Sequence, residues 1–251
     1  VGAGNLGADA ESCMMAADCM AALGIGEGDY LVRINNRKIM DGLLQRIGLT
    51  TEQADYEARR MTILRAMDKY DRLGLAGVRD LLGAGRRDES GDFTAGAGLD
   101  EAQIEAVIGL VSAQGASRPE MLNALEAQIG DTAAGTSGIA ELRDMDALFT
   151  RLGYGVERLC IDPSIVRGLG YYTGPVYEID LTFDTQDSDG TVTRFGSVGG
   201  GGRYDDLIKR FKGVEIPATG ISIGVSRLAG ALAVLGRDVA DAVPERGAVR
   251  G

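Results

Sequence analysis

Apolar residues change their spacing twice along this chain of 251 residues, and the change limits the folds open to it. From about residue 50 to residue 146 they recur every three or four positions, and no strand pattern occurs. Alternating segments rich in β-formers lie on both sides of this stretch. We therefore expect an α+β fold in which a helical insertion domain, residues 50–140, interrupts a sheet domain made of residues 1–49 and 141–240.

The flanking parts predict an antiparallel sheet with flanking helices. Asp9 can cap a helix over 11–23 that Gly24 ends. Glycine-rich stretches at 83–98 and 130–138 are interpreted as breaks between helices. Strands are predicted at 30–35, 155–161, 175–183, 191–198 and 221–225, helices at 36–46, 140–152 and 205–211, a hairpin turn at 187–190, and a linker at 241–251.

The chain contains no histidine, which excludes Ser-His-Asp and Cys-His catalysis as well as histidine metal ligands. The three cysteines, Cys13, Cys19 and Cys160, lack CxxC spacing and are interpreted as small buried apolar residues. We thus expect no metal site built from His or Cys. The remaining chemistry is that of arginine, carboxylate, tyrosine and metal-bound phosphate.

The net charge of −11 means that any contact with nucleic acid must depend on a local basic surface. Residues 59–87 provide one, because eight Lys and Arg residues oppose three Asp there. A solvated helix face is the simpler interpretation of such a run, and a nucleic-acid contact through Arg59, Arg60 and Arg65 is the alternative.

No apolar run reaches the roughly 20 residues that span a bilayer, and the start has no features of a secretory signal, so we expect a cytoplasmic protein with no membrane contact. Both ends of the sequence are expected to be cut from a longer chain, because it starts at Val1 without a methionine and stops where a strand is about to begin.

Three short segments in the last third of the chain, at 167–178, 196–208 and 220–228, combine arginine, tyrosine and glycine. The glycines at 199–202 would let a ligand lie directly on the backbone N–H groups, and the guanidiniums of Arg167 and Arg227 could each hold phosphate. A glycine-rich turn between a strand and a helix is the structural alternative. Together the segments predict a site for a polyanion.

Neighbouring side chains have two interpretations each. If Tyr171 and Tyr172 are extended, one ring points to each face of the sheet and one hydroxyl can enter a pocket. Glu178 stands in a strand, where it should bind something or face water. Arg203, Tyr204 and Asp205 could equally form a structural knot in which Asp205 caps the following helix.

The ordered set Arg167-Gly-Leu-x-Tyr-Tyr-Thr-Gly, Gly-Gly-Arg203-Tyr204-Asp205 and Gly-x-x-Gly-x-x-Arg227-Leu resembles the histidyl-tRNA synthetase family. Residues 32–44 are similar to a further stretch of that family, and residues 50–140 to its insertion domain, which approaches the tRNA acceptor arm. The resemblance covers essentially the whole chain. It implies a class II synthetase core that joins histidine to ATP, with Mg²⁺, and transfers it to tRNA(His), in a homodimer.

The resemblance also implies residue roles. Arg167 would hold the α-phosphate as the carboxylate of histidine attacks ATP, and Tyr172 would reach the imidazole. Arg227 would lie against the adenine and near the γ-phosphate. The remaining implied residues of this pocket are Gly224, Gly200 and Gly201 for ATP, and Tyr204 and Gly202 for histidine.

Several family features are absent or altered. Motifs 1 and 2 would lie before Val1, and the anticodon-binding domain would follow Arg250. Gly170 stands where the family usually has an acidic residue, and Asp206 where glycine is common. Two alternatives therefore stay open: the non-catalytic regulatory subunit of ATP phosphoribosyltransferase, which resembles the same fold, and an inactive fragment of a synthetase.

Overall fold

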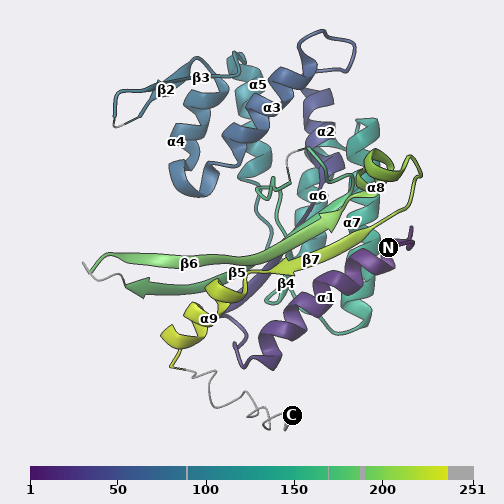
Figure 1. Cartoon of the computed structure of the whole chain (residues 1–251). Helices are drawn as coiled ribbons and strands as arrows, with labels where there is room; N and C mark the ends of the chain where they lie inside the picture. The colour runs from purple at the N-terminus through teal and green to yellow at the C-terminus, as the bar shows by residue number, and fades with distance from the viewer. Residues whose placement is uncertain (89, 169, 187–189, 237–251) are drawn as a thin grey trace, which may run out of the picture.

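The structure is a computed structural model that describes residues 1–88, 90–168, 170–186 and 190–236 (Figure 1). Its centre is a five-stranded sheet in the order β4-β1-β5-β6-β7. The strands are β1 (Tyr30–Asn36), β4 (Leu159–Ile161), β5 (Pro175–Gln186), β6 (Val192–Arg203) and β7 (Thr219–Ile223). The predicted α+β class, a central sheet with flanking helices, is confirmed. The sheet is not wholly antiparallel, because β4 pairs with β1 in parallel after a helical connection.

Two groups of helices surround the sheet. The core group is α1 (Gly7–Ala22), α2 (Arg37–Arg46), α6 (Arg118–Ile129), α7 (Ala133–Arg151), α8 (Asp205–Lys212) and α9 (Val225–Val234). The group drawn above the sheet in Figure 1 contains α3 (Tyr56–Met67), α4 (Tyr70–Leu82) and α5 (Glu101–Val111). None of the described helices is both long and apolar enough to cross a membrane.

The central strands give the sheet one apolar and one polar face. Val32 pairs with Ile179 and Ile34 with Tyr177 across β1 and β5, and these four side chains are fully buried. The residues between them, Arg33 and Glu178, also pair and point to the opposite face. Helix α1 packs on the sheet through contacts with β1, β5 and β7. The alternation thus leaves one face for the core and one for polar chemistry.

The sequence predicted Asp9 as the cap of the first helix, and the structure shows that it is not the cap. The helix begins earlier, at Gly7, and Asp9 lies inside it with no solvent exposure. Its carboxylate is bound by Arg203 instead of by the backbone of the first turn. The predicted end is confirmed, since Gly24 follows the helix with φ +75°.

The inserted module is not purely helical. A short antiparallel hairpin, β2 (Gly85–Arg87) with β3 (Phe93–Ala95), falls inside the stretch where no strand was predicted. Each strand has three residues and is partly or fully exposed, so neither shows the alternation that marks a strand in sequence. Gly85 begins the hairpin at φ +108°, a conformation that favours glycine.

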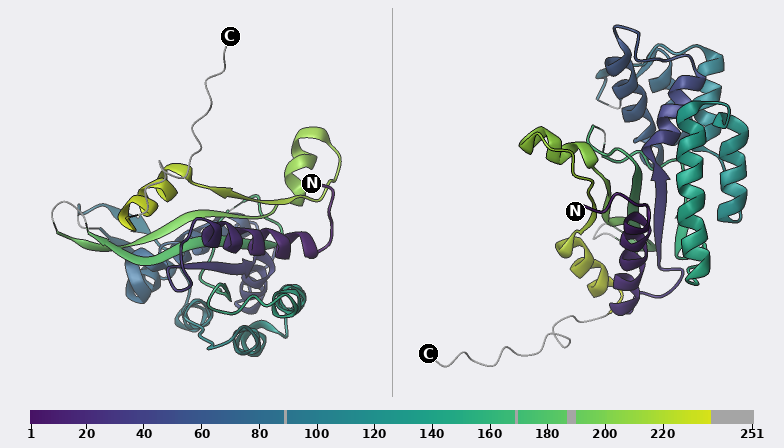
Figure 2. Two further views of the ribbon diagram at one scale, coloured as in Figure 1. Left: turned by 90° about the horizontal axis from the view of Figure 1, so that it is seen from below. Right: turned by 90° about the vertical axis from the view of Figure 1, so that its right-hand side faces the viewer.

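Residue 140, the predicted end of the insertion domain, lies inside α7, and the predicted domain limits stay a prediction. The predicted break between helices at 130–138 is confirmed at Gly130, which separates α6 from α7, whereas residues 133–138 lie inside α7. A Cβ on Gly42 of α2 would lie 2.7 Å from the backbone of Gly135, and one on Gly138 would lie 2.9 Å from the Cβ of Lys38. Glycine here allows α2 and α7 to pack closely, which places α6 and α7 beside the sheet domain (Figure 2).

Other predicted elements differ mainly at their ends. β4 is shorter than the predicted strand at 155–161, because the amide of Leu159 donates to the carbonyl of Gly155 in a turn. The final strand ends at Ile223, and the predicted helix at 205–211 is confirmed as α8. The turn at 187–190 falls largely outside the described residues, and the linker at 241–251 falls entirely outside them.

Candidate functional site

The polar face of the sheet forms the floor of an open cavity of about 940 Å³. All three sequence segments that predict a polyanion site contribute to its wall. Of the predicted site residues, those that line it are Arg167, Tyr172, Gly200, Gly201, Gly224 and Arg227. The structure therefore brings both predicted phosphate-binding arginines to one cavity.

The glycines at 199–202 lie inside the central strand β6, not in a turn between a strand and a helix. Gly200 pairs with Glu178 on one side and Ser222 on the other, so it belongs to the same row as the polar face. A Cβ at Gly200 would lie 2.8 Å from the carbonyl oxygen of Tyr177. The strand is thus a flat floor without side chains, and a ligand can approach its backbone closely.

Gly202 and Tyr204 are not among the described residues that line the cavity. A Cβ on Gly202 would meet the ring of Tyr172 at 2.9 Å, so this ring covers the floor at that point. Tyr204 lies near the sheet edge, where its hydroxyl would be 3.4 Å from a Cβ on Gly220. Their predicted contacts with histidine stay predictions.

Tyr171 and Tyr172 are not in an extended segment, so the condition for placing their rings on opposite faces of the sheet is not met. They follow a turn at Gly168, where φ is +69°, and their ring centroids are 4.3 Å apart. Tyr172 is half-buried, and burial first, then Tyr171, raises the pKa of its hydroxyl. That hydroxyl is held neutral and can donate or accept a hydrogen bond inside the cavity.

Gly170, the position where an acidic residue was expected from the resemblance, has φ +122°. Residues with an L side chain rarely adopt this conformation, although a Cβ there would meet no atom within 4 Å. The local turn next to Arg167 is therefore built for glycine in this chain.

Arg167 is held at the cavity wall by an ion pair with Glu178. The carboxylate is buried, whereas the guanidinium is about half exposed. Burial raises the pKa of Glu178, and Asp180 adds to the rise, while Ser197 and Arg167 lower it. The pair fixes one edge of the guanidinium and leaves the rest available to an anion.

Arg227 lies in the first turn of α9 on another wall of the cavity. It donates to the carbonyl oxygen of Phe195 at 2.8 Å, and its guanidinium carbon lies 5.5 Å from the centroid of that ring. The side chain is otherwise exposed. It can therefore stack on or donate to a ligand without first losing a carboxylate partner.

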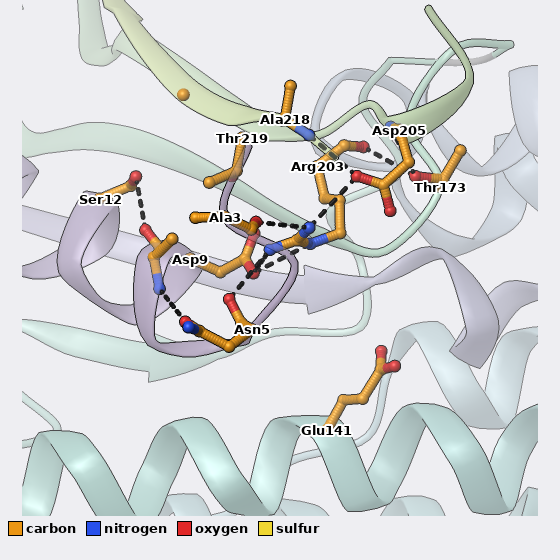
Figure 3. A network of polar contacts seen from close by, with 12 residues as sticks. Ala3, Asn5, Asp9, Ser12, Glu141, Thr173, Arg203, Asp205, Ala218 and Thr219 are labelled. Atoms are coloured by element: carbon orange, nitrogen blue, oxygen red, sulfur yellow. Dashed lines mark hydrogen bonds and ion pairs between the residues drawn. The ribbon is translucent and has the colours of Figure 1, made fainter. Parts of the chain in front are cut away.

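Arg203 forms a structural knot, as one of the two sequence interpretations proposed (Figure 3). Its Nε and one terminal nitrogen donate to Asp9 at 3.0 and 2.5 Å. The guanidinium of Arg203 also donates to the carbonyl oxygens of Ala3 and Asn5 and to the carboxylate of Asp205. The side chains of Arg203 and Asp9 are almost wholly buried. Arg203 thus ties the N-terminal segment to β6.

Asp205 belongs to this knot but does not cap α8. It is the first residue of the helix, and the cap position is Tyr204, without a side-chain cap bond. One carboxylate oxygen of Asp205 accepts from Arg203 and from the amide of Ala218 at 3.0 Å. Its own amide donates to the hydroxyl of Thr173, which joins the tyrosine turn to the same network (Figure 3).

The predicted basic contact residues lie on α3 in unequal settings. Arg60 pairs with Asp41 at 3.6 Å and with Glu57 at 3.7 Å. Arg59 is half-buried, whereas Arg65 is exposed and, in the part of the chain that the structure describes, has no ion pair. Arg65 and Lys69 line a cleft of about 280 Å³ that also includes Thr94 and Ala95 of the hairpin.

Sequence reasoning missed several residues of the cavity. Ser222 could have been found, because it pairs with Gly200 in an alternating strand. Asp68 could not, because it lies between two helices of the inserted module, far from the three segments in sequence. Arg33 was also missed as the centre of an ion cluster beside the cavity, with Asp162 at 2.8 Å and Asp180 at 2.7 Å.

Comparison with known proteins agrees with this geometry. The family model for histidyl-tRNA synthetase matches residues 1–228. The histidine–tRNA ligase of Jannaschia sp. (strain CCS1) is 53% identical over 237 residues, which cover 94% of this chain and 46% of that protein. The chain spans about half the length of the curated relatives it matches.

Two solved structures are similar as well. The crystal structure of histidyl-tRNA synthetase from Nostoc sp. PCC 7120 is 28% identical with a TM-score of 0.73, covering 93% of this chain and 48% of that one. An ATP phosphoribosyltransferase regulatory subunit/histidyl-tRNA synthetase from Bacillus halodurans C is 22% identical with a TM-score of 0.65, covering 92% and 51%. At that identity the second likeness shows the fold alone.

Proposed function

The chain belongs to the histidyl-tRNA synthetase family, and we propose that it carries the cavity in which histidine and ATP form histidyl-adenylate before transfer to tRNA(His). The observation that carries the proposal is the convergence of Arg167, Tyr172, Arg227 and the glycine strand on one cavity. ATP enters as its Mg²⁺ complex, so the metal arrives with the substrate.

Arg167 is the residue we assign to the reacting phosphate. Attack of a carboxylate on the α-phosphorus builds negative charge on the equatorial oxygens, and a fixed guanidinium stabilises that charge. The ion pair with Glu178 supports this role, because it holds Arg167 in place before the substrate binds. Pyrophosphate is the leaving group, and its charge would be shared with Mg²⁺ and Arg227.

Tyr172 and the glycine strand are assigned to binding. A neutral tyrosine hydroxyl suits an imidazole nitrogen, which can be a donor or an acceptor. Gly200, Gly201 and Gly224 would admit the nucleotide next to the backbone. In line with the resemblance, we also propose Tyr204 and Gly202 for histidine, a homodimer and a cytoplasmic location for the whole protein.

Contact with tRNA is assigned to the exposed side of α3. Arg65 on α3 and Lys69 in the turn after it offer two cations next to a cleft, and Arg59 lies on the same helix as Arg65. Arg60 is the weakest member of the predicted set, because two carboxylates already share it. Lys and Arg side chains that keep their charge free are the ones that displace counterions from RNA phosphates.

The decisive experiment is histidine-dependent exchange of labelled pyrophosphate into ATP. The unmodified protein should catalyse exchange with histidine but not with other amino acids. Arg167→Ala should slow exchange by about 100-fold or more with a small effect on histidine affinity, because its contact strengthens in the transition state. Tyr172→Phe should mainly raise the histidine concentration needed.

The same experiment separates the alternatives. Binding of histidine without exchange would favour a non-catalytic binding protein or an inactive fragment and would overturn the proposed catalysis. The reverse ranking of the two variants would overturn the residue roles and leave the family membership untouched.

A further inference from the structure

The loop that leads from β4 to Arg167 is bound by a buried side chain of β1. Asn35 has no solvent exposure, and its side-chain amide donates to the carbonyl oxygens of Pro163 at 3.1 Å and Ile165 at 2.9 Å. Its side-chain oxygen accepts from the backbone amide of Asn36 at 2.8 Å. Both N–H groups and the oxygen of the Asn35 side chain therefore have partners, and these partners fix the orientation of the amide.

The bond from Asn35 to Ile165 is the last one that fixes the loop before Arg167. Among the backbone hydrogen bonds of the described residues, none holds Val166 or Arg167. The side chains of Ile165 and Val166 are buried, with 3% and 2% of their surface exposed. The position of the Arg167 backbone therefore depends on the packing of two apolar side chains and on the side-chain amide of Asn35.

Arg167 is thus held at two points by adjacent strands of the sheet. Glu178 of β5 pairs with its guanidinium, and Asn35 of β1 binds the backbone two residues before it. Both anchors lie on the polar face, because Arg33 is opposite Glu178 and Asn35 is two positions after Arg33 in the same strand. The sheet therefore fixes both the head group and the loop of Arg167.

We propose that Asn35 is a positioning residue for the adenylation step, an inference that rests on the proposed function. Asn35 is not among the described residues that line the cavity, so it would act through Arg167. A guanidinium stabilises the charge that develops on a phosphate only when it is already in place, and a small misplacement costs much of the rate. Asparagine suits this task, because buried carbonyl oxygens need donors and an apolar residue would leave two of them without a partner.

Asn36 offers a matched control in the next position of the same strand. It is equally buried, but its side chain donates to Glu141 of α7 at 2.6 Å and accepts from the backbone amide of Lys38 at 3.0 Å. Asn36→Ala therefore also removes a buried asparagine with two hydrogen bonds, on the face away from the loop. Both alanine variants should lose stability, so exchange is measured at a temperature at which thermal unfolding shows each of them folded.

The test measures kcat and KM for histidine-dependent pyrophosphate exchange. We expect Asn35→Ala to lower kcat by about 10- to 100-fold with little change in KM for histidine, and Asn36→Ala to keep the unmodified kcat. The double variant of Asn35→Ala with Arg167→Ala should be no slower than Arg167→Ala alone, because the two residues act as one unit. If Asn35→Ala does not fold, Asn35→Ser, which keeps one donor, is compared with Asn36→Ser in the same way.

A second measurement does not depend on activity. A loop that is no longer held should move Arg167 away from Glu178 and raise the pKa of Glu178, because Arg167 is one of the groups that lower it. A pH titration of the labelled Glu178 carboxyl carbon in Asn35→Ala and Asn36→Ala measures this effect.

Two outcomes would overturn the inference while leaving the proposed function intact. One is a kcat that falls equally in Asn35→Ala and Asn36→Ala, or in neither. The other is a loss from Asn35→Ala that adds in full to that of Arg167→Ala. No exchange by the unmodified protein would overturn the proposed function itself, and the Glu178 titration would still decide whether Asn35 positions Arg167.

Discussion

The exposed guanidinium of Arg167 and the buried carboxylate of Glu178 form an ion pair, with 45% and 8% of their side chains exposed. Glu178 sits on the polar face of the sheet opposite Gly200, and Arg167 follows a loop after β4. A residue from the sheet thus positions a residue on a loop. Because Glu178 is buried, it holds the Arg167 guanidinium in place as a rigid anion-binding group without adding a second carboxylate to the cavity surface.

Replacing Arg167 by Ala should raise the pKa of Glu178 further, because burial already raises it and Arg167 is one of the groups that lower it. The folded state would then hold the proton to higher pH than the unfolded chain does. The contribution of Glu178 to stability should accordingly fall as pH rises from the ordinary carboxyl range through this raised value. A pH titration of the labelled Glu178 carboxyl carbon measures the shift, and Arg227→Ala should leave it unchanged.

Asp9→Asn should lower the free energy of unfolding by about 3 kcal/mol, because it leaves the buried guanidinium of Arg203 without its charged partner. Denaturant unfolding measures this change. Asp18→Asn is the control, since it breaks an ion pair with Arg158 in which Asp18 is 57% exposed. That change should cost less than about 1 kcal/mol, and equal losses in the two variants would contradict the structural role of Arg203.

Gly201→Ala should prevent or strongly destabilise folding. A Cβ there would lie 1.9 Å from the carbonyl oxygen of Gly220 and 2.8 Å from the ring of Tyr177. The contrasting variant is Gly230→Ala in α9, where a Cβ would meet nothing within 4 Å. Since alanine is the better helix former, that change should stabilise the protein by about 0.8 kcal/mol. Thermal unfolding of both variants tests whether the floor needs glycine for packing as well as for ligand access.

These contacts show why some features could be predicted from the sequence and others could not. The alternation of a strand and the apolar spacing of a helix depend only on residues that are close in sequence. The bounds of β1, β5, α2 and α8 were therefore predicted close to those observed. The partnership of Arg203 with Asp9 spans 194 positions and leaves no local pattern. The turn that was the structural alternative for the glycines at 199–202 does not occur. Glycine is depleted in strands, so the sequence did not indicate that β6 continues through them, whereas here the crowded neighbouring strands exclude a Cβ. The motif order brought Arg167 and Arg227 together correctly, but it gave no sign of Asp68.

Cys160 should react slowly with iodoacetamide, in agreement with its interpretation as an apolar residue. Burial, with a further effect from Asp162, raises the pKa of the Cys160 thiol to about 12. At pH 8 only about one molecule in ten thousand would carry the reactive thiolate. Burial also raises the pKa of Cys13, so modification should favour Cys19, which is partly exposed. Peptide mass spectrometry after labelling at several pH values checks the order, and rapid labelling of Cys160 would contradict it.

The last prediction concerns RNA, and it uses the unequal settings of the basic residues on α3 and in the turn that follows it. Replacing both Arg65 and Lys69 by Ala should weaken binding of tRNA(His) and reduce the dependence of log affinity on log salt by about one unit per residue. Arg60→Ala should have a smaller effect, because Asp41 and Glu57 already neutralise its charge. Salt screens each charge beyond about 8–10 Å at physiological ionic strength. The acidic remainder of the chain therefore does not cancel the positive potential at the cleft.

Filter binding over a potassium chloride series measures these slopes, and histidine-dependent pyrophosphate exchange serves as the control that the cavity is intact. A slope that is unchanged in the Arg65 and Lys69 double variant would make α3 an ordinary solvated helix face. A change of slope per residue in Arg60→Ala that equals the one in the Arg65 and Lys69 double variant would instead show that RNA displaces the carboxylates from Arg60. In that case, Arg60 would contribute to the contact together with Arg65 and Lys69.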